Sequence, residues 1–247
     1  MQAVLNARGD GHLLSYAFSG SLVIQPLVTP SLRIDPNKDY APVSILYETK
    51  QAIYTNMATP FNDVKGLIAY AKANPGKLNG GSSGIGGTSH LALELFKSIT
   101  HINIVHVPYK GEGESIPALM GDQIQMTITP AGPKQFVDAG RLRVLATTGK
   151  ERWSVFPDTP TVMEAGVPEF SFTLWIALIA PPGTPSDVVA KLNSAFNGAL
   201  KSPEVLRRLQ AVGGDVVIET PAQVTTRILA DFERLGPVIR ESGISAN

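Results

Sequence analysis

The sequence predicts an α/β protein whose strands are mostly parallel. Between about residue 62 and residue 147, short apolar segments alternate with segments whose apolar residues recur every three or four positions. This alternation is typical of parallel sheets whose strands are joined by helices. Two long extended segments, Ala52–Asn56 and Phe170–Ala180, bracket the alternating block. A chain that leaves one lobe and later returns to it would have this pattern.

The expected strands are short apolar segments that end at glycine, proline or polar residues. They are His12–Phe18, Val43–Tyr47, Ala52–Asn56, Lys77–Ser82, Ile102–Tyr109, Ile124–Ile128, Leu142–Thr147, Phe170–Ala180 and Val216–Ile218. A small-residue turn, Ser19-Gly20-Ser21, follows the first strand, and Pro26–Pro42 is expected to be an irregular connection.

The expected helices begin at capping residues or at prolines. Asn62 and Ser186 are expected to be N-caps, and Asn74-Pro75-Gly76 is expected to end the helix that Asn62 begins. The helices are a first one that ends near Arg8, Asn62–Ala73, Thr88–Ile99, Ser115–Met120, Gln135–Ala139, Ser186–Leu200, and two that open at Pro203 and Pro221.

The composition is that of an ordinary globular protein. Of 247 residues, 43% are hydrophobic and 17% are charged, which is enough apolar material for a real core. The formal net charge is +0, the pI is about 6.9, and no block of like charges occurs. We therefore expect neither a nucleic-acid surface nor a polybasic membrane patch.

Several kinds of site have no sequence signature. Cysteine is absent, so disulfides, thiolate nucleophiles and cysteine zinc sites do not arise. The histidines His12, His90, His101 and His106 lack metal-ligand spacing, and no cofactor is implied. We find no apolar run long enough to enter and span a bilayer, and the N-terminal residues do not resemble a signal peptide.

A glycine-rich segment, Gly80–His90, stands between an expected strand and an expected helix. Glycines allow close approach of a ligand to the backbone, and the free N–H groups and dipole of a helix start favour an anion. An ordinary strand-to-helix turn capped by Thr88 or Ser89 is the competing interpretation, and both stay open. The residues that would bind are Ser82, Ser83, Gly84, Gly86, Gly87, Thr88, Ser89 and His90.

A nucleotide-dependent short-chain dehydrogenase is a further alternative for this segment. Gly-x-x-x-Gly-Ile-Gly can hold a dinucleotide pyrophosphate when it follows a buried strand near the start of the fold. Here the preceding residues 74–79 make a poor central strand, and the Tyr-x-x-x-Lys of that family is missing. The context therefore disfavours the dehydrogenase interpretation.

Other segments carry weaker signals. Tyr109 lies where a strand runs into a loop and is a candidate ligand contact, whereas Glu112 and Glu114 are expected to form a solvated pair rather than catalytic carboxylates. Trp175 lies in an apolar strand and would usually be core. No Ser-His-Asp order or nucleophile elbow stands out, so we expect that the protein is not an enzyme.

Taken in order, many segments resemble the Bug/TctC family of extracytoplasmic solute receptors, which serve tripartite tricarboxylate transporters and related systems. The matching segments cover nearly the whole chain. They are residues 35–43, 71–78, 84–96, 106–111, 139–143, 157–166 and 180–185, including His106-Val107-Pro108-Tyr109-Lys110-Gly111 and Ala180-Pro181-Pro182-Gly183-Thr184-Pro185.

The resemblance implies a type II periplasmic-binding fold, in which crossing strands join two α/β lobes that close over a small carboxylate. Lobe 1 would comprise residues 1–55 and 173–247, and lobe 2 residues 56–172. The Ser82–Ser89 turn would hold a ligand carboxylate through backbone N–H groups and ordered water. Ser19, Ser21 and Trp175 would border the cleft from lobe 1, and Thr129 from lobe 2.

Two departures from the family pattern stand out. Relatives usually begin with a strand, a glycine-containing loop, a helix and a strand before the segment that matches Met1, so lobe 1 is expected to be incomplete. Relatives also commonly carry an Asp-Asn pair where this chain has Thr129-Pro130-Ala131, which suggests a different or less polar ligand.

The leading hypothesis is a periplasmic, non-catalytic receptor for a small organic acid or related anion, whose partners are membrane transporter subunits or a sensor. The alternative is a truncated receptor-like protein that binds no solute and acts through protein contacts, because an incomplete sheet exposes an edge and apolar surface.

Overall fold

The computed structural model describes residues 2–29, 31–32 and 34–244. Its contacts divide the chain into two compact units, which we describe separately. The first unit contains the chain up to Thr49 together with Leu174–Pro237. The second contains Lys50–Thr173 and the chain from Val238 to the last described residue.

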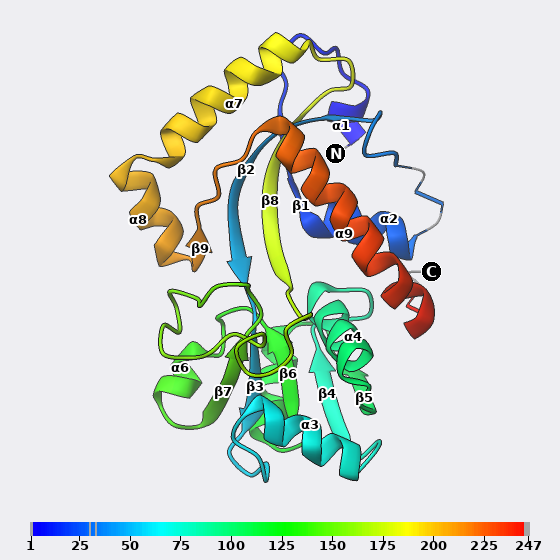
Figure 1. The fold of residues 1–247 in the computed structure, drawn as a ribbon, viewed down its shortest axis with the longest axis vertical. Helices are drawn as coiled ribbons and strands as arrows, with labels where there is room; N and C mark the ends of the chain where they lie inside the picture. The colour runs from blue at the N-terminus through cyan, green and yellow to red at the C-terminus, as the bar shows by residue number, and fades with distance from the viewer. Residues whose placement is uncertain (1, 30, 33, 245–247) are drawn as a thin grey trace. The chain divides into compact units, whose positions relative to one another are not determined.

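The first unit is built on a four-stranded sheet with the order β1-β8-β2-β9 (Figure 1). β1 runs antiparallel to β8, and the two-residue β9 runs antiparallel to β2. The strands are β1 (Ser15–Phe18), β2 (Ala41–Lys50), β8 (Thr173–Ala180) and β9 (Gly214–Asp215). The helices are α1 (Gln2–Leu5), the π-helix η1 (Gly20–Ile24), α2 (Gln25–Val28), α7 (Ser186–Leu200), α8 (Pro203–Ala211) and α9 (Pro221–Ser242), of which α9 continues past Pro237 into the second unit.

Apolar side chains hold α7 to the first sheet. Val189 of α7 is buried in one cluster with Val43 of β2 and Leu178 of β8, and Leu192 and Phe196 pack against it. Burial of this kind stabilises by roughly 25 cal/mol per Å² of apolar surface removed from water, so the periodic apolar face of α7 explains its position.

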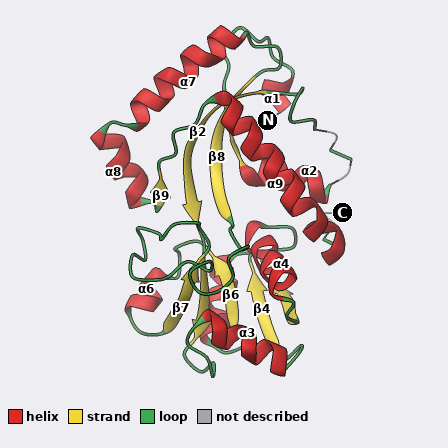
Figure 2. Cartoon of the chain, in the orientation of Figure 1, coloured by secondary structure: helices red, strands yellow, loops and turns green. Residues whose placement is uncertain are grey.

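The second unit is built on a five-stranded sheet with the order β5-β4-β6-β3-β7 (Figure 1), and Figure 2 draws its strands in yellow. β4 pairs in parallel with β5 and β6, while β3 is antiparallel to β6 and β7. The strands are β3 (Ala52–Asn56), β4 (Leu78–Ser82), β5 (Ile104–Pro108), β6 (Met126–Thr129) and β7 (Leu142–Thr147). The helices are α3 (Val64–Ala73), α4 (Thr88–Thr100), α5 (Glu112–Met120) and α6 (Lys134–Asp138). This confirms the expected α/β class. The expectation of mostly parallel strands was wrong, because antiparallel pairs occur in both sheets and the parallel pairs described are those of β4 with β5 and β6.

Two successive glycines in β4 let the sheet be covered closely on both faces. A Cβ atom at Gly80 would lie 2.8 Å from Cδ2 of Leu93 on α4 and 3.1 Å from Cγ2 of Ile104. A Cβ atom at Gly81 would overlap the side chain of Ile124. Because successive residues of a strand point to opposite faces, the pair serves the packing of both layers.

Several sequence-based predictions of local structure were wrong. Ser19-Gly20-Ser21 is not a turn but leads into η1, which continues directly into α2, so Pro26 lies in a helix and not in an irregular connection. Residues 30 and 33 of that predicted connection lie outside the described part, as does Met1 of the predicted first helix. Val216–Ile218 is not a strand, and the short pairing falls at Gly214–Asp215 instead.

Two predicted caps were wrong for local reasons. Asp63, not Asn62, is the N-cap of α3, and its carboxylate accepts the N–H of Gly66 at 2.7 Å. Ser186 is the first residue of α7 and Pro185 takes the cap position, without a side-chain hydrogen bond. Neighbouring residues with similar capping propensity make an error of one position easy.

Replacing Gly80 by Ala is expected to destabilise the protein by about 1–3 kcal/mol, because the new methyl group would push Leu93 and Ile104 out of their packed positions. Urea denaturation followed by circular dichroism measures the change. Gly113→Ala in α5 is the matched control: no atom lies within 4 Å of its added Cβ, so stability should be unchanged or slightly higher. Equal stability of both variants would contradict the packing role of Gly80.

Candidate anion-binding site

The candidate site lies at one end of the second unit's sheet, where the strand termini meet. β4, β5, β6 and β7 all terminate there, and β3 begins there, because β3 alone runs in the opposite direction. In open α/β sheets, ligands bind outside the carboxyl ends of the parallel strands. The turn after β4, residues 83–87, connects this end of the sheet to the start of α4.

The backbone N–H groups of this turn are largely used within the turn itself. The N–H of Ser83 donates to Oγ of Ser89 at 2.9 Å, and the N–H of Gly84 donates to Oγ of Ser82 at 3.3 Å. The N–H of Gly86 donates to Nδ1 of His90 at 3.1 Å, and that of Gly87 to the carbonyl oxygen of Gly84 at 3.3 Å. Gly86 has φ +72°, which favours glycine at this position.

The first N–H groups of α4, by contrast, are free. Gly87 occupies the N-cap position and offers no side-chain acceptor. Within the described part of the chain, no acceptor pairs with the N–H groups of Thr88, Ser89 or His90. Uncapped N–H groups and the positive end of the helix dipole together attract an anion. Thr88 and Ser89 are therefore helix residues, not the N-caps that the competing interpretation required.

Two histidines lie directly beneath the turn. The rings of His90 on α4 and His106 on β5 are stacked, with centroids 3.6 Å apart and planes inclined by 9°. Nε2 of His106 lies 2.6 Å from Oγ of Ser82. Burial lowers the pKa of both imidazoles to about 4, with the positive charge of Lys97 adding to the effect on His90 and the partner imidazole adding to it on His106. Both rings are therefore neutral at neutral pH.

Gln51, which was not anticipated from the sequence, brings an unpaired acceptor to the same end of the sheet. Its side chain is fully buried, and Nε2 lies 3.4 Å from Oγ1 of Thr88. Oε1 of Gln51 and Oγ1 of Thr147 have no hydrogen-bond partner among the described residues. Buried polar atoms are usually paired, so unpaired ones here indicate a polar site. A glutamine before a strand carries no motif, so only the tertiary structure reveals it.

The other predicted residues of the second unit have defined contacts. The N–H of Tyr109 donates to the carbonyl oxygen of Ser82 at 3.0 Å, which ties the loop after β5 to the end of β4. Oγ1 of Thr129 donates to the carboxylate of Glu112. Glu112 is thus not part of a solvated pair with Glu114, whose carboxylate accepts the N–H of Lys110 instead.

The predicted residues of the first unit are committed to structural contacts there. Oγ of Ser21 bonds to the backbone of Phe18, and Oγ of Ser19 lies 3.5 Å from the N–H of Trp175. Trp175 is 1% exposed, and its Nε1–H donates to Asp231 on α9 at 2.8 Å. These contacts lie at the end of β1 and near the start of β8.

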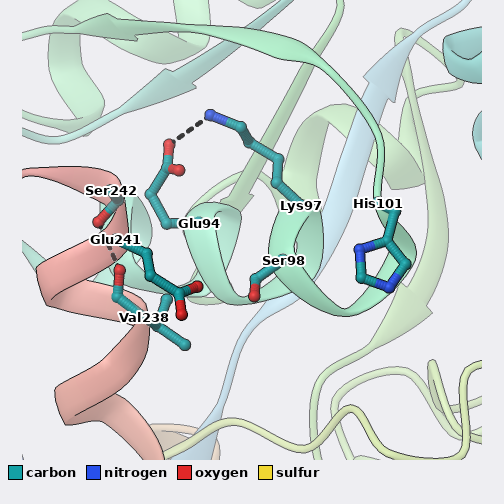
Figure 3. Close-up of a pocket in the computed structure, with 7 residues that line it drawn as sticks. All are labelled: Glu94, Lys97, Ser98, His101, Val238, Glu241 and Ser242. Carbon is teal, nitrogen blue, oxygen red and sulfur yellow. Dashed lines mark hydrogen bonds and ion pairs between the residues drawn. The ribbon is translucent and has the colours of Figure 1, made fainter.

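A separate polar pocket of the second unit lies between α4 and the end of α9, and Figure 3 shows its side chains. Glu94 pairs with Lys97 at 2.7 Å within it. None of the predicted ligand residues lines it; the lining residues are Glu94, Lys97, Ser98, His101, Val238, Glu241 and Ser242.

Within the described residues, no cluster of histidine and carboxylate side chains has the geometry to hold a metal ion. Among the same residues, no helix is both long and apolar enough to cross a membrane.

Solved structures share this fold. A structure of an R. palustris protein with adipate is 30% identical with a TM-score of 0.79, and the match covers 98% of this chain and 82% of that one. MatC from Rhodopseudomonas palustris with bound malate is 28% identical with a TM-score of 0.73, and the match covers 96% of this chain and 82% of MatC. The fold is that of the α/β periplasmic solute-binding proteins.

The family follows from the sequence comparisons. The family model of TctC, the tripartite tricarboxylate transporter family receptor, matches residues 1–244, and the chain belongs to this family. Protein BugT from Bordetella pertussis is 33% identical over 244 residues, which cover 98% of this chain and 74% of BugT. The expected Bug/TctC relationship is therefore confirmed, and the family is one of solute receptors.

The lowered pKa values of His90 and the partly buried His106 predict a pH dependence of stability. An unfolded chain binds a proton at each histidine near pH 6.5, whereas the folded protein does so only near pH 4. The contribution of the two histidines to the free energy of unfolding should therefore be fully present above pH 6.5. It should fall as the pH is lowered toward 4, by on the order of 1 kcal/mol per pH unit for each histidine. Urea denaturation at pH 7, 6, 5 and 4 measures this fall. In the double variant His90→Asn/His106→Gln, the free energy of unfolding should depend much less on pH. A wild-type protein whose stability varies with pH as little as the variant's would contradict the lowered pKa values of the two histidines.

Proposed function

We propose that this chain binds a small organic acid in the periplasm and delivers it to a membrane transporter or sensor. Its family is one of receptors, and similar proteins were solved with adipate and with malate. Both of these are dicarboxylates. The proposed ligand of this chain therefore carries at least one carboxylate group, and the protein has no catalytic step.

The observation that carries the proposal is the uncapped start of α4. The N–H groups of Thr88, Ser89 and His90 lack acceptors among the described residues, and they lie where parallel strands end. A carboxylate placed there would complete the helix in the way that a capping side chain does elsewhere. Hydroxyl groups of Thr88 and Ser83 lie in the same turn and could add further hydrogen bonds.

This mode of binding requires no ion pair. The segment from Ser82 to His90 contains no lysine or arginine, and His90 is neutral at neutral pH. Backbone donors of a helix start favour negative charge by about 0.3–1 kcal/mol, up to about 2 in partly buried geometry. In this proposal, Gly84, Gly86 and Gly87 shape the turn, while Tyr109 and Thr129 border it. The proposed contributions of Ser19, Ser21 and Trp175 rest on the family resemblance alone.

A second candidate function, action through protein contacts, is favoured by the edge of the first unit's sheet. β1 is the last strand on its side, and Tyr16 and Phe18 are 64% and 51% exposed. Their rings meet edge to face with centroids 5.4 Å apart. An edge strand with exposed aromatic side chains is a template for pairing with another chain. Size-exclusion chromatography with light scattering over a range of protein concentrations tests this candidate. A protein that stays monomeric at all concentrations would exclude pairing of two copies of the chain.

A thermal-shift screen against mono-, di- and tricarboxylates, including adipate and malate, tests the proposed receptor function. At a free ligand concentration of a hundred times Kd, stability should rise by about 2.7 kcal/mol, a shift of several degrees for a chain of this size. A nicotinamide nucleotide serves as the control for the dehydrogenase alternative and should give no shift. Cooperative melting without a shift for any carboxylate would overturn the receptor proposal.

Thr88→Glu should weaken carboxylate binding about tenfold or more without destabilising the fold. A glutamate in the first turn interacts favourably with the helix dipole, so α4 should be as stable as before. The same negative charge would repel a carboxylate bound at the helix start and weaken it by about tenfold or more. Isothermal titration calorimetry measures the affinity. Thr88→Gln introduces a side chain of nearly the same shape as glutamate but without its charge, so this variant should retain most of the wild-type affinity. Equal loss of affinity in both variants would show that the negative charge does not cause the loss.

A further inference from the structure

The stacked pair of His90 and His106 connects three parts of the chain at one point. His90 comes from α4, His106 comes from β5, and their contacts reach the end of β4 and the turn after it. His90 is 6% exposed. His106 is partly buried. Imidazoles shielded from water are unfavourable unless their ring nitrogens have hydrogen-bond partners, which apolar rings would not need.

Each ring has such a partner in the turn. Nδ1 of His90 accepts the N–H of Gly86, so its proton resides on Nε2, which lies 3.7 Å from the carboxylate of Glu94. Nε2 of His106 and Oγ of Ser82 share a hydrogen bond of 2.6 Å. Oγ of Ser82 in turn accepts the N–H of Gly84. The two rings therefore fix both ends of the turn that leads to the free N–H groups of α4.

We propose that His90 and His106 are positioning residues of the anion-binding turn, which they hold as a neutral, stacked pair. His90 takes up the N–H of Gly86 and keeps that residue at its positive φ, while His106 fixes Ser82 at the end of β4. With the turn fixed in this conformation, the first N–H groups of α4 keep no acceptor among the described residues. This inference rests on the proposed function of the site as a carboxylate receptor.

Only the neutral form can play this role. A protonated His90 would direct an Nδ1–H group at the N–H of Gly86, and two stacked imidazolium rings would repel each other. The charged groups that face the pair are Glu94 and Lys97 of α4, and the pocket beside them also contains Glu241 of α9 (Figure 3). β4 contributes the hydroxyl of Ser82, and β5 contributes His106 itself. Glu94 is already paired with Lys97, so it does not oppose the neutral form strongly.

Four variants separate hydrogen bonding from ring packing. His90→Asn keeps an acceptor near the position of Nδ1 but loses the ring, whereas His90→Phe keeps a ring but loses the acceptor. His106→Gln and His106→Phe make the same division at Nε2. His101→Asn is the control, because His101 lies at the far end of α4 in a left-handed conformation that asparagine tolerates.

The first readout needs no ligand: hydrogen exchange of the Gly86 amide, followed by NMR of the complete chain at pH 7. His90→Phe should accelerate this exchange about tenfold or more relative to neighbouring helix amides, because the amide loses its acceptor. His90→Asn should stay within about threefold of the wild type, as should His101→Asn. The two-bond nitrogen–proton spectrum of wild-type His90 should show the tautomer that is protonated on Nε2.

The second readout is the affinity for succinate, measured by calorimetry. The two Phe variants should bind about tenfold more weakly, and the Asn and Gln variants should retain most of the affinity. The opposite order, with the Phe variants intact and the Asn and Gln variants impaired, would overturn the proposal and assign the pair to packing. If wild-type protein binds no succinate or other carboxylate while Gly86 exchange follows the expected pattern, the proposed function fails and the hold of the histidines on the turn stands.

Discussion

Close contact between α4 and the five-stranded sheet is the constraint on which the second unit depends. Gly80 leaves room for Leu93 on one face of β4, and Gly81 leaves room for Ile124 on the other. A side chain at either position would move a layer outward by the width of a methyl group. The start of α4 would then no longer meet the strand ends in the same place. Dense packing thus fixes the position of groups several residues further along the chain.

The backbone N–H groups between β4 and the first turn of α4 fall into two sets, one bonded within the protein and one without an acceptor among the described residues. Most N–H groups of the turn that follows β4 donate to Ser82, Ser89, His90 or a carbonyl oxygen, and these bonds hold the turn in place without a ligand. The N–H groups of the first helical turn are left over. A preorganised set of donors loses little entropy on binding, which is a general way to gain affinity.

Local patterns predicted the α/β class, most strands and the glycine-rich turn, because these follow from residue periodicity and from backbone requirements. The π-helix at Gly20–Ile24 was missed, since its residues also suit a turn and only the packing of Leu22, Val23 and Ile24 decides between them. The stacking of His90 on His106 and the unpaired acceptor of Gln51 were missed too. Both depend on which strands become neighbours, and no spacing along the chain encodes that order.

The donors at the start of α4 belong to the main chain, and this has an evolutionary consequence. No substitution short of proline removes a backbone N–H, so the donors themselves persist when side chains around the turn change. In the proposed receptor, neighbouring side chains such as Gln51, Tyr109 and Thr129 would then be the ones that determine which acid fits. Point mutations of these side chains would therefore change which organic acid the proposed receptor prefers, while the main-chain donors remain in place.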